Sequence, residues 1–124
     1  MRFRRRKGIS TSLRSGTGLV ELHGEVDITA IAEIEGAMLA LVEKGPERIV
    51  VDFTDATFVD SKATEAFMRS AQAAHAAGVT VVAAGANGGV ARALDVYGLD
   101  RAMPLYHTRE EALVATGASG AADG

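Results

Sequence analysis

The stretch from residue 49 to residue 77, IVVDFTDATFVDSKATEAFMRSAQAAHAA, decides the fold. Its first part, residues 49–53, is a nearly continuous run of apolar and β-branched side chains, which is typical of a strand buried on both faces of a parallel sheet. Residues 63–77 are rich in alanine, and their apolar side chains recur at helical spacing up to a stop at Gly78. A buried strand that leads directly into an amphipathic helix indicates an α/β domain.

Upstream of this stretch, the sequence predicts a hairpin and a helix. Residues 11–13 and 19–24 have a β pattern and flank a turn rich in Ser, Gly and Thr, so they predict a hairpin with one solvent-facing side. Residues 28–43 carry apolar side chains at spacings of three and four, which predicts an amphipathic helix. Asp27 or Thr29 can cap the N-terminus of that helix with a side-chain oxygen.

Downstream, strands and helices continue to alternate. Residues 79–84 are a second apolar run, which predicts another buried strand. Residues 90–97 and 110–115 predict short helices, and any strand at residues 102–106 must lie at an edge because the segment contains Pro104. The alternation predicts one α/β domain with a central mixed sheet of four to five strands and helices packed against it.

The composition fits a single compact domain. The chain has 124 residues, of which 48% are hydrophobic and 23% are charged, and it has no cysteine, which excludes disulfides and thiolate metal sites. No apolar run approaches the roughly 18 residues of a membrane span, and no secretory signal follows the N-terminal charges. We therefore expect a cytoplasmic protein with a basic tail at residues 1–8, a domain at residues 9–115 and a disordered Gly/Ala tail at residues 116–124.

Charge is unevenly distributed along the chain. The formal net charge is −3, but a basic run near the N-terminus carries +5, which leaves −8 on residues 8–124. The run consists of Arg2, Arg4, Arg5, Arg6 and Lys7. Such a run can dock on nucleic acid or anionic lipid, but the acidic body repels the same polyanions. A solvated tail or the exposed start of an edge strand is favoured, and we expect no direct contact with nucleic acid or membrane.

Residues that could carry catalysis or bind a metal are not arranged for either task. His23, His75 and His107 are far apart, without the short spacing of a metal site, and no G-x-S-x-G motif surrounds a serine. The turn at residues 85–89, GANGG, matches neither common phosphate-binding motif, so an ordinary strand-to-helix turn is favoured over a nucleotide site. We expect no catalytic residue, metal, cofactor or enzyme activity.

The segment at residues 58–65, FVDSKATE, carries the most functional information. It connects a buried strand to the start of a helix, where Asp60 or Ser61 can accept a bond from a free backbone N–H. A hydroxyl at this point is also well placed for phosphorylation, because a phosphate would add negative charge beside the helix start. Lys62 opposes the helix dipole unless Asp60 or Glu65 offsets its charge, which hints at a role outside folding.

The sequence resembles the STAS domain family, in particular the single-domain bacterial anti-sigma-factor antagonists. The resemblance covers nearly the whole chain and implies the STAS fold. In such antagonists the dephosphorylated domain binds an anti-sigma factor that is also a serine-protein kinase, and phosphorylation inactivates the antagonist. The segments that carry the resemblance are LHGEVD at residues 22–27, IVVDF at 49–53, FVDS at 58–61, GVTVV at 78–82 and ARALDVYGLD at 91–100.

The chain departs from the family at the phosphorylation motif. The usual text is Asp-Ser-Ser-Gly-Leu or Asp-Ser-Thr-Gly-Leu, with the second hydroxyl usually taking the phosphate. Here the stretch reads Asp60-Ser61-Lys62-Ala63-Thr64, so a cation replaces the usual acceptor. The resemblance implies Ser61 as the phosphorylation site, and it implies that Asp27 and residues 60–64 bind the partner.

Three functional interpretations remain open at this point. In the first, the chain is an anti-sigma-factor antagonist whose phosphorylation control is altered or lost. In the second, it is a STAS interaction module in a transport or stress-signalling complex, with Lys62 contacting an acidic partner. In the third, it binds a small molecule or nucleotide through the turn at residues 85–89 and the loop at Asp27. The sequence predicts no particular oligomeric state.

Overall fold

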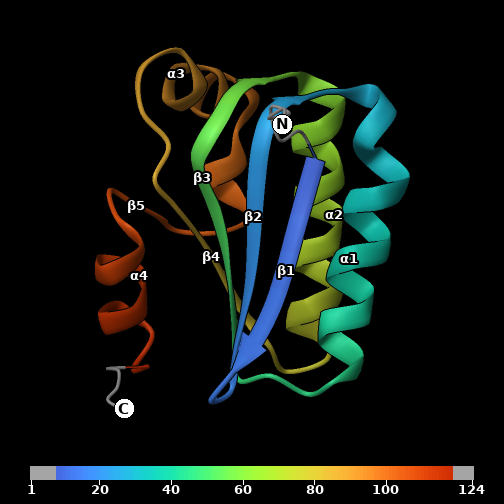
Figure 1. Cartoon of the computed structure of the whole chain (residues 1–124), viewed down its shortest axis with the longest axis vertical. Coiled ribbons are helices and arrows are strands. Elements are labelled where there is room, and N and C mark those ends of the chain that lie inside the picture. Colours follow the sequence, from blue (N-terminus) through green and yellow to red (C-terminus); the bar gives the residue numbers. More distant parts are fainter. Residues whose placement is uncertain (1–7, 119–124) are drawn as a thin grey trace, which may run out of the picture.

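The computed structural model describes residues 8–118, which form one five-stranded mixed sheet with helices packed on it (Figure 1). The strands lie in the order β1-β2-β3-β4-β5, with β1 antiparallel to β2 and every other neighbouring pair parallel. The elements are β1 (Gly8–Arg14), β2 (Thr17–Val26), η1 (Ile28–Ala30), α1 (Ile31–Glu43), β3 (Arg48–Val59), α2 (Ser61–Ala76), β4 (Thr80–Ala84), α3 (Gly88–Tyr97), η2 (Leu99–Arg101), β5 (Leu105–Tyr106) and α4 (Arg109–Ala115). The predicted α/β fold with a mixed central sheet is confirmed.

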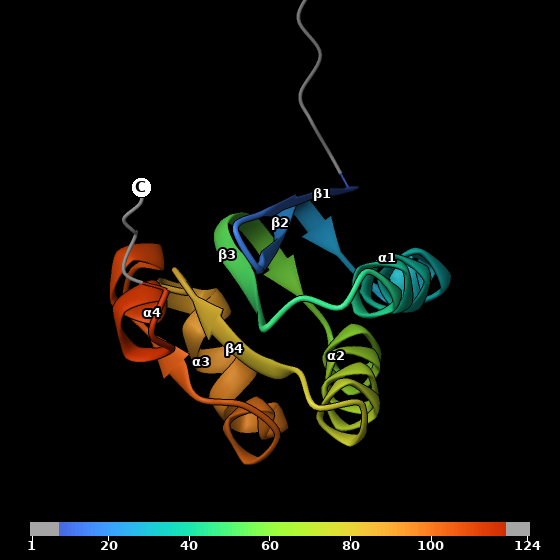
Figure 2. The same cartoon turned by 90° about the horizontal axis from the view of Figure 1, so that it is seen from below.

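Helices cover both faces of the sheet (Figure 2). The larger core cluster joins one face of the sheet to α1, α2 and α3, and the smaller one joins the other face to α4. The central strand β3 contributes Val51 to the larger cluster and Val50 to the smaller one, and both side chains are fully buried. The prediction that this apolar run is a strand buried on both faces is therefore confirmed.

Aromatic packing joins β3 to α2. The rings of Phe53 and Phe67 meet edge to face with their centroids 5.6 Å apart, and both side chains are buried. Four small residues of α2, Ala63, Ala66, Ala71 and Ala74, are also fully buried. Small side chains let the helix axis approach the sheet closely, which explains the alanine-rich sequence of α2.

Strand β3 is longer than predicted. It continues past Phe53 to Val59, and its pairing with β2 shifts register twice before Val26 pairs with Val59. In this second half residues 54–58 are exposed or half-buried and only Val59 is buried, so it lacks the continuous apolar run that marks the first half. The extension is important for function, because the C-terminal ends of β2 and β3 then lie side by side at one edge of the sheet.

Two helix starts also differ from the prediction. Helix α2 begins at Ser61, two residues before the predicted start. The predicted helix at residues 28–43 begins as the 3₁₀ turn η1, and Asp27 caps that turn, whereas α1 itself starts at Ile31 without a side-chain cap. The other predicted elements lie close to their predicted positions, including the edge strand β5, which directly follows Pro104.

Hydrogen bonds join the first residue of β3 to the C-terminal part of the fold. Arg48 is buried, and its guanidinium donates to the backbone oxygen of Thr116 (3.2 Å) and to the hydroxyl of Thr17 (2.9 Å). The N–H of Ala118 also bonds back to the oxygen of Leu113 (2.9 Å). Residues 116–118, which the sequence assigned to the C-terminal tail, therefore continue the fold. Gly8 of the predicted N-terminal tail begins β1, and residues 1–7 and 119–124 lie outside the described residues.

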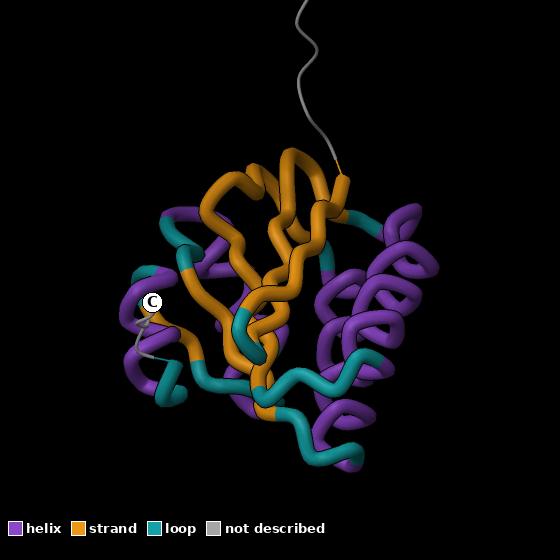
Figure 3. The backbone as a smooth tube through the Cα atoms, turned by 60° about the horizontal axis from the view of Figure 1, so that its bottom comes forward, coloured by secondary structure: helices purple, strands orange, loops and turns teal. Residues whose placement is uncertain are grey.

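The smooth trace in Figure 3 shows how the sheet twists between the helices. None of the helices within residues 8–118 is both long and apolar enough to cross a membrane.

Candidate functional site

The ends of β2 and β3 bring together the two loops that the sequence singled out. Val26 pairs with Val59 in the parallel ladder, and the N–H of Asp60 donates to the oxygen of Val26 (3.1 Å). The residues that follow each strand, Asp27 and Asp60, therefore leave the sheet at the same edge. Side chains at the carboxyl ends of adjacent parallel strands commonly form binding sites for this reason.

Asp60 joins the two loops directly. Its Oδ1 accepts a hydrogen bond from the N–H of Ala63 (2.8 Å) and caps α2, while its Oδ2 accepts one from the N–H of Ile28 (3.1 Å) in η1. The sequence predicts a cap from Asp60 or Ser61, and the structure shows that Asp60 is the cap. Because both carboxylate oxygens are used, Asp60 fixes the position of η1 relative to α2.

Asp27 organises its own loop. Its Oδ1 accepts hydrogen bonds from the N–H (3.0 Å) and the hydroxyl (2.5 Å) of Thr29, which closes the turn into η1. A capping role for Asp27 is therefore confirmed, although the element that it caps is η1.

Ser61 and Lys62 form the start of α2 beside this junction. Ser61 is half-buried, and no hydrogen bond of its hydroxyl is seen within residues 8–118. The side chain of Lys62 is 59% exposed, and its Nζ lies 3.7 Å from Oε1 of Glu65, one turn along the helix. Glu65 thus offsets the unfavourable position of a cation at the helix N-terminus, as the sequence suggested.

Two residues expected to bind a partner are not accessible. Ala63 and Thr64 are both fully buried, and the Thr64 hydroxyl donates to the backbone oxygen of Asp60 (2.9 Å). The position is buried because α2 starts at Ser61, so the third and fourth residues of the helix already face the sheet. A partner that docks on this conformation cannot reach either side chain.

Two exposed apolar side chains flank the junction, and sequence reasoning missed both. Ile28 is 57% exposed and Phe58 is 49% exposed, although both are large hydrophobic residues. An aromatic residue just before a strand end and a capped helix indicates a contact surface when it is exposed. Because the predicted strand ended at residue 53, Phe58 was not recognised as lying at a strand end. We call the group of Asp27, Ile28, Phe58, Asp60, Ser61 and Lys62 the strand-end surface.

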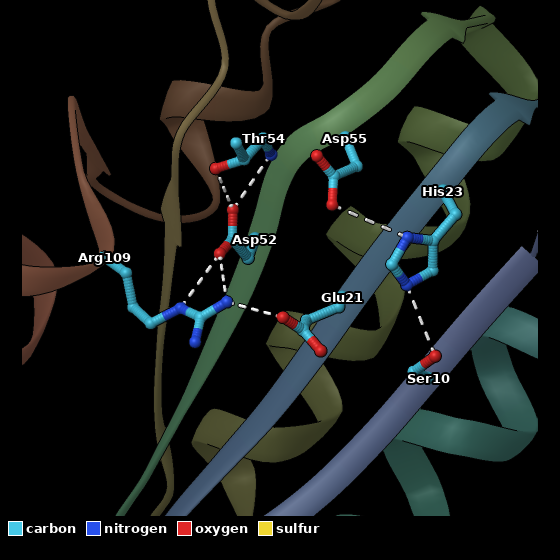
Figure 4. Close-up of polar contacts among 7 residues, drawn as sticks. All are labelled: Ser10, Glu21, His23, Asp52, Thr54, Asp55 and Arg109. Atoms are coloured by element: carbon cyan, nitrogen blue, oxygen red, sulfur yellow. Dashed lines mark hydrogen bonds and ion pairs between the residues drawn. The ribbon is translucent and has the colours of Figure 1, made fainter. Parts of the chain in front are cut away.

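A separate cleft of about 410 Å³ opens over the other face of β2 and β3. At its centre, Arg109 of α4 bridges two carboxylates, with Nε 3.0 Å from Oδ2 of Asp52 and Nη2 2.5 Å from Oε2 of Glu21 (Figure 4). The other oxygen of Asp52 accepts bonds from the hydroxyl (2.6 Å) and the N–H (2.9 Å) of Thr54. A buried carboxylate requires such partners, so Asp52 alone was a sequence signal for a buried ion pair.

The electrostatics of the pair follow from its contacts. Burial alone would raise the pKa of Asp52, but the hydrogen bonds from Thr54 and Arg109 outweigh burial and hold that pKa below its ordinary value of 3.8. Burial likewise acts to lower the pKa of Arg109, and the bonds to Asp52 and Glu21 outweigh it, so that pKa is raised. Both groups are therefore charged at neutral pH, and the bridge ties α4 to the sheet.

The same cleft bears on the nucleotide interpretation. Gly85 and Asn87 line it, but no residue of the Asp27 loop does, so the two parts of that hypothetical site are not in one cleft of the described structure. Gly85 has a positive φ of 83°, and a β-carbon there would lie 2.2 Å from the Thr54 hydroxyl. Close packing against β3 is thus sufficient to explain the glycine.

His23 is a further polar residue of the sheet with defined contacts. Its Nε2 lies 3.3 Å from the hydroxyl of Ser10, and its Nδ1 lies 3.7 Å from Oδ2 of Asp55 (Figure 4). The three residues come from β1, β2 and β3, so they link the three strands side by side. No group of three or more His, Cys, Asp or Glu residues within residues 8–118 is arranged to hold a metal ion.

With this geometry established, comparisons with known proteins identify related folds. The family model described as "STAS domain" matches residues 9–112. No curated protein matches the chain.

Several solved structures superpose on nearly the whole chain. An anti-sigma-factor antagonist (STAS) domain protein from Planctomyces limnophilus is 17% identical with a TM-score of 0.77, covering 90% of this chain and 99% of its own. An anti-sigma factor antagonist from Mycobacterium paratuberculosis is 27% identical with a TM-score of 0.69, covering 87% and 92%. The phosphorylated form of the Bacillus cell fate determinant SpoIIAA is 20% identical with a TM-score of 0.65, covering 87% and 98%.

Proposed function

The chain belongs to the STAS domain family, and from this premise we propose that it is a cytoplasmic anti-sigma-factor antagonist that binds an anti-sigma factor through the strand-end surface. The observation that carries the proposal is the exposure of Ile28 and Phe58 on either side of the Asp60 junction. Large apolar side chains that stay exposed beside fixed polar groups are typical of a protein–protein interface. The likeness to an antagonist at 27% identity supports the same role.

The structure of the junction explains how the surface keeps its shape. Asp60 uses both carboxylate oxygens within the fold, so it positions Ile28 and α2 and offers little to a partner. The residues left to make contact are Ile28, Phe58, Ser61 and Lys62. A surface of two apolar anchors with a hydroxyl and a cation binds a partner without any chemical step, and we therefore propose no enzyme activity.

Phosphorylation, if it controls this protein, falls on Ser61. Thr64, the other hydroxyl of the motif, is fully buried and donates to the oxygen of Asp60, so a kinase cannot reach it. Ser61 is partly accessible at the first position of α2. A phosphate there would meet the free N–H groups of the helix start and the nearby Lys62, and it would add about two negative charges to the contact surface. We propose that this charge releases the partner.

The direct experiment is affinity capture from the native bacterium with a matched pair of variants. Ile28→Asp places a charge inside the strand-end surface, and Leu39→Asp places the same charge on α1 at a residue of equal exposure, 58% against 57%. We expect the wild type and Leu39→Asp to retain an anti-sigma factor, identified by mass spectrometry, and Ile28→Asp to lose it. Retention of that anti-sigma factor by Ile28→Asp would contradict the proposed surface, and retention of transporter subunits alone would contradict the proposed role.

A further inference from the structure

Within residues 8–118, strand β1 leaves one edge of the sheet open. It is the first strand in the order of the sheet, and among the described strands it pairs only with β2, with an unbroken register from Gly8 to Arg14 (Figure 1). Exposed edges usually carry a proline, a lysine or a bulge, which prevents pairing with another strand. The sequence GISTSLR of β1 has no proline or lysine, and its pairing with β2 has no bulge.

The backbone groups that face this open edge can be identified from the turn. Only Ser15 and Gly16 connect β1 to β2, with φ of 51° and 80°, so Arg14 and Thr17 form the hydrogen-bonded pair that closes a two-residue hairpin. Hydrogen-bonded and non-hydrogen-bonded pairs alternate along an antiparallel ladder. The N–H and C=O groups of Ile9, Thr11 and Leu13 therefore point away from β2, toward the open edge.

The sequence of β1 is symmetric about Thr11. Read in either direction, Ile9-Ser10-Thr11-Ser12-Leu13 gives an aliphatic residue, serine, threonine, serine and an aliphatic residue. Ile9 packs against the larger core cluster, so by strand alternation Thr11 and Leu13 face the same side of the sheet. A two-fold axis through Thr11 would thus place each side chain opposite one of its own kind.

We propose that β1 pairs antiparallel with β1 of a second copy of this chain, about a two-fold axis at Thr11. The pairing places Thr11 opposite Thr11, and Ile9 opposite Leu13 of the other copy. Since these are the residues whose N–H and C=O groups face outward, the three pairs exchange six backbone hydrogen bonds and form a continuous ten-stranded sheet. Leu13, 40% exposed in the single chain, then lies against Ile9 of the other copy.

Charges at this edge favour the same arrangement. Arg14, the one charged residue of β1, comes opposite Gly8 of the other copy, so no like charges face each other. Beside Gly8 lies Glu33 of α1, whose Oε2 is 3.8 Å from the place of a β-carbon at Gly8. Arg14 of one copy thus approaches the carboxylate of Glu33 in the other.

The symmetric sequence of β1 favours a second copy of this chain, and not a strand of another protein, as the partner at the open edge. A strand of a different protein would gain nothing from a palindrome, whereas a two-fold interface requires that the same patch fit itself. Dimerisation through β1 uses neither the strand-end surface nor the Arg109 cleft. The inference therefore stands or fails independently of the proposed function.

The first test compares two variants at the centre of the strand. Thr11→Pro removes the two central hydrogen bonds of the proposed interface, because the Thr11 N–H faces outward, and it spares the ladder with β2. Thr11→Val keeps the N–H and the shape of the side chain. By sedimentation velocity of the full chain over a concentration series, we expect wild type and Thr11→Val to dimerise. Thr11→Pro should raise the dimer dissociation constant by at least about tenfold.

A charge exchange then tests the two-fold axis itself. Thr11→Lys and Thr11→Glu each place like charges opposite each other, so each variant alone should dimerise less than wild type. An equimolar mixture places Lys opposite Glu and should recover the dimer, a result that misfolding of either variant cannot give. A wild type that is monomeric throughout the series would overturn the inference. So would a dimer that is unaffected by Thr11→Pro, or a mixture that is no more dimeric than either variant alone.

Discussion

Oδ2 of Asp60 accepts a hydrogen bond from the N–H of Ile28, 32 residues away in sequence, while Oδ1 of the same carboxylate caps α2. One side chain thus joins the loop after β2 to the loop after β3. Ile28 stays exposed in a fixed position because of this bond, and it can serve as an apolar anchor without a rigid element of its own. The arrangement explains how a short loop presents a defined contact surface.

Two substitutions of Asp60 separate the contributions of its two hydrogen bonds to stability. Asp60→Asn keeps one accepting oxygen for the α2 cap but turns an N–H₂ group toward the N–H of Ile28, so we expect a loss of about 1 kcal/mol in the free energy of unfolding. Asp60→Ala loses both bonds and should cost about 2 kcal/mol. Urea denaturation measures the losses, and hydrogen exchange should be faster at the Ile28 amide in both variants. An Asp60→Asn variant as stable as the wild type would show that the bond to Ile28 contributes nothing.

The Asp52–Arg109 bridge predicts a defined loss of stability in acid. Because the pKa of Asp52 is lower in the folded chain than its ordinary value of 3.8, the unfolded chain binds more protons between the two values, and stability rises with pH there. The contribution is complete above about pH 5 and is lost as pH falls through the folded pKa. We expect Asp52→Asn to lower stability at pH 6 and to reduce its fall between pH 6 and pH 3.

The control for this prediction is Asp95→Asn, which removes an exposed carboxylate of α3. Its free energy of unfolding should follow the wild-type pH dependence throughout, as measured by urea denaturation at each pH. A pH dependence of Asp52→Asn that coincides with wild type would show that this carboxylate is not linked to folding.

Alanine substitutions at two glycines should change the free energy of unfolding in opposite directions. Gly85→Ala forces an L residue to φ 83° and puts a β-carbon 2.2 Å from the Thr54 hydroxyl, so we expect a loss of about 3 kcal/mol. Gly36→Ala lies in the middle of α1 with no atom within 4 Å of the new β-carbon, and should stabilise the chain by about 0.5–1 kcal/mol. Thermal unfolding distinguishes the two outcomes. A neutral Gly85→Ala would mean that the turn after β4 can adopt another conformation.

Phosphorylation is tested by intact mass. With the purified kinase partner and ATP, we expect wild type to gain the mass of one phosphate and Ser61→Ala to gain none, while Ser70→Ala on the same helix behaves as wild type. Ser61→Glu should weaken partner binding, since it adds a negative charge to the contact surface. An unchanged wild-type mass would remove phosphorylation control from the account but leave the partner surface in place.

The sequence predicted the sheet and the main helices because these depend on local periodicity. A strand buried on both faces requires a continuous apolar run, as at residues 49–53. A helix buried along one side requires apolar residues at helical spacing, as in the alanine pattern of α2. Both patterns can be read from the sequence. The second half of β3 has no such pattern, because residues 54–58 are exposed or half-buried and only Val59 reaches the core, beside two register shifts in the pairing with β2. Phe58 was therefore missed as an exposed anchor, and with it half of the apolar character of the strand-end surface.

Long-range contacts were beyond the reach of a single sequence. Asp52 in an apolar strand signals a cation partner, but nothing local indicates that the partner is Arg109, 57 residues later. Thr64 is buried because α2 starts at Ser61. The predicted start lies two residues later, so Thr64 was expected to be accessible to a partner. An error of two residues in one helix start thus changed which side chains a partner could touch.

The most direct test of the central claim is displacement of a sigma factor from its anti-sigma factor by the purified chain, measured as a dissociation constant. The account predicts that wild type and Leu39→Asp displace the sigma factor with equal affinity, and that Ile28→Asp and Phe58→Asp bind at least about tenfold more weakly because they charge the apolar anchors. The three variants and the wild type should unfold at similar urea concentrations, since the substituted side chains are about half exposed or more. Equal displacement by Ile28→Asp, Phe58→Asp and wild type would contradict the account.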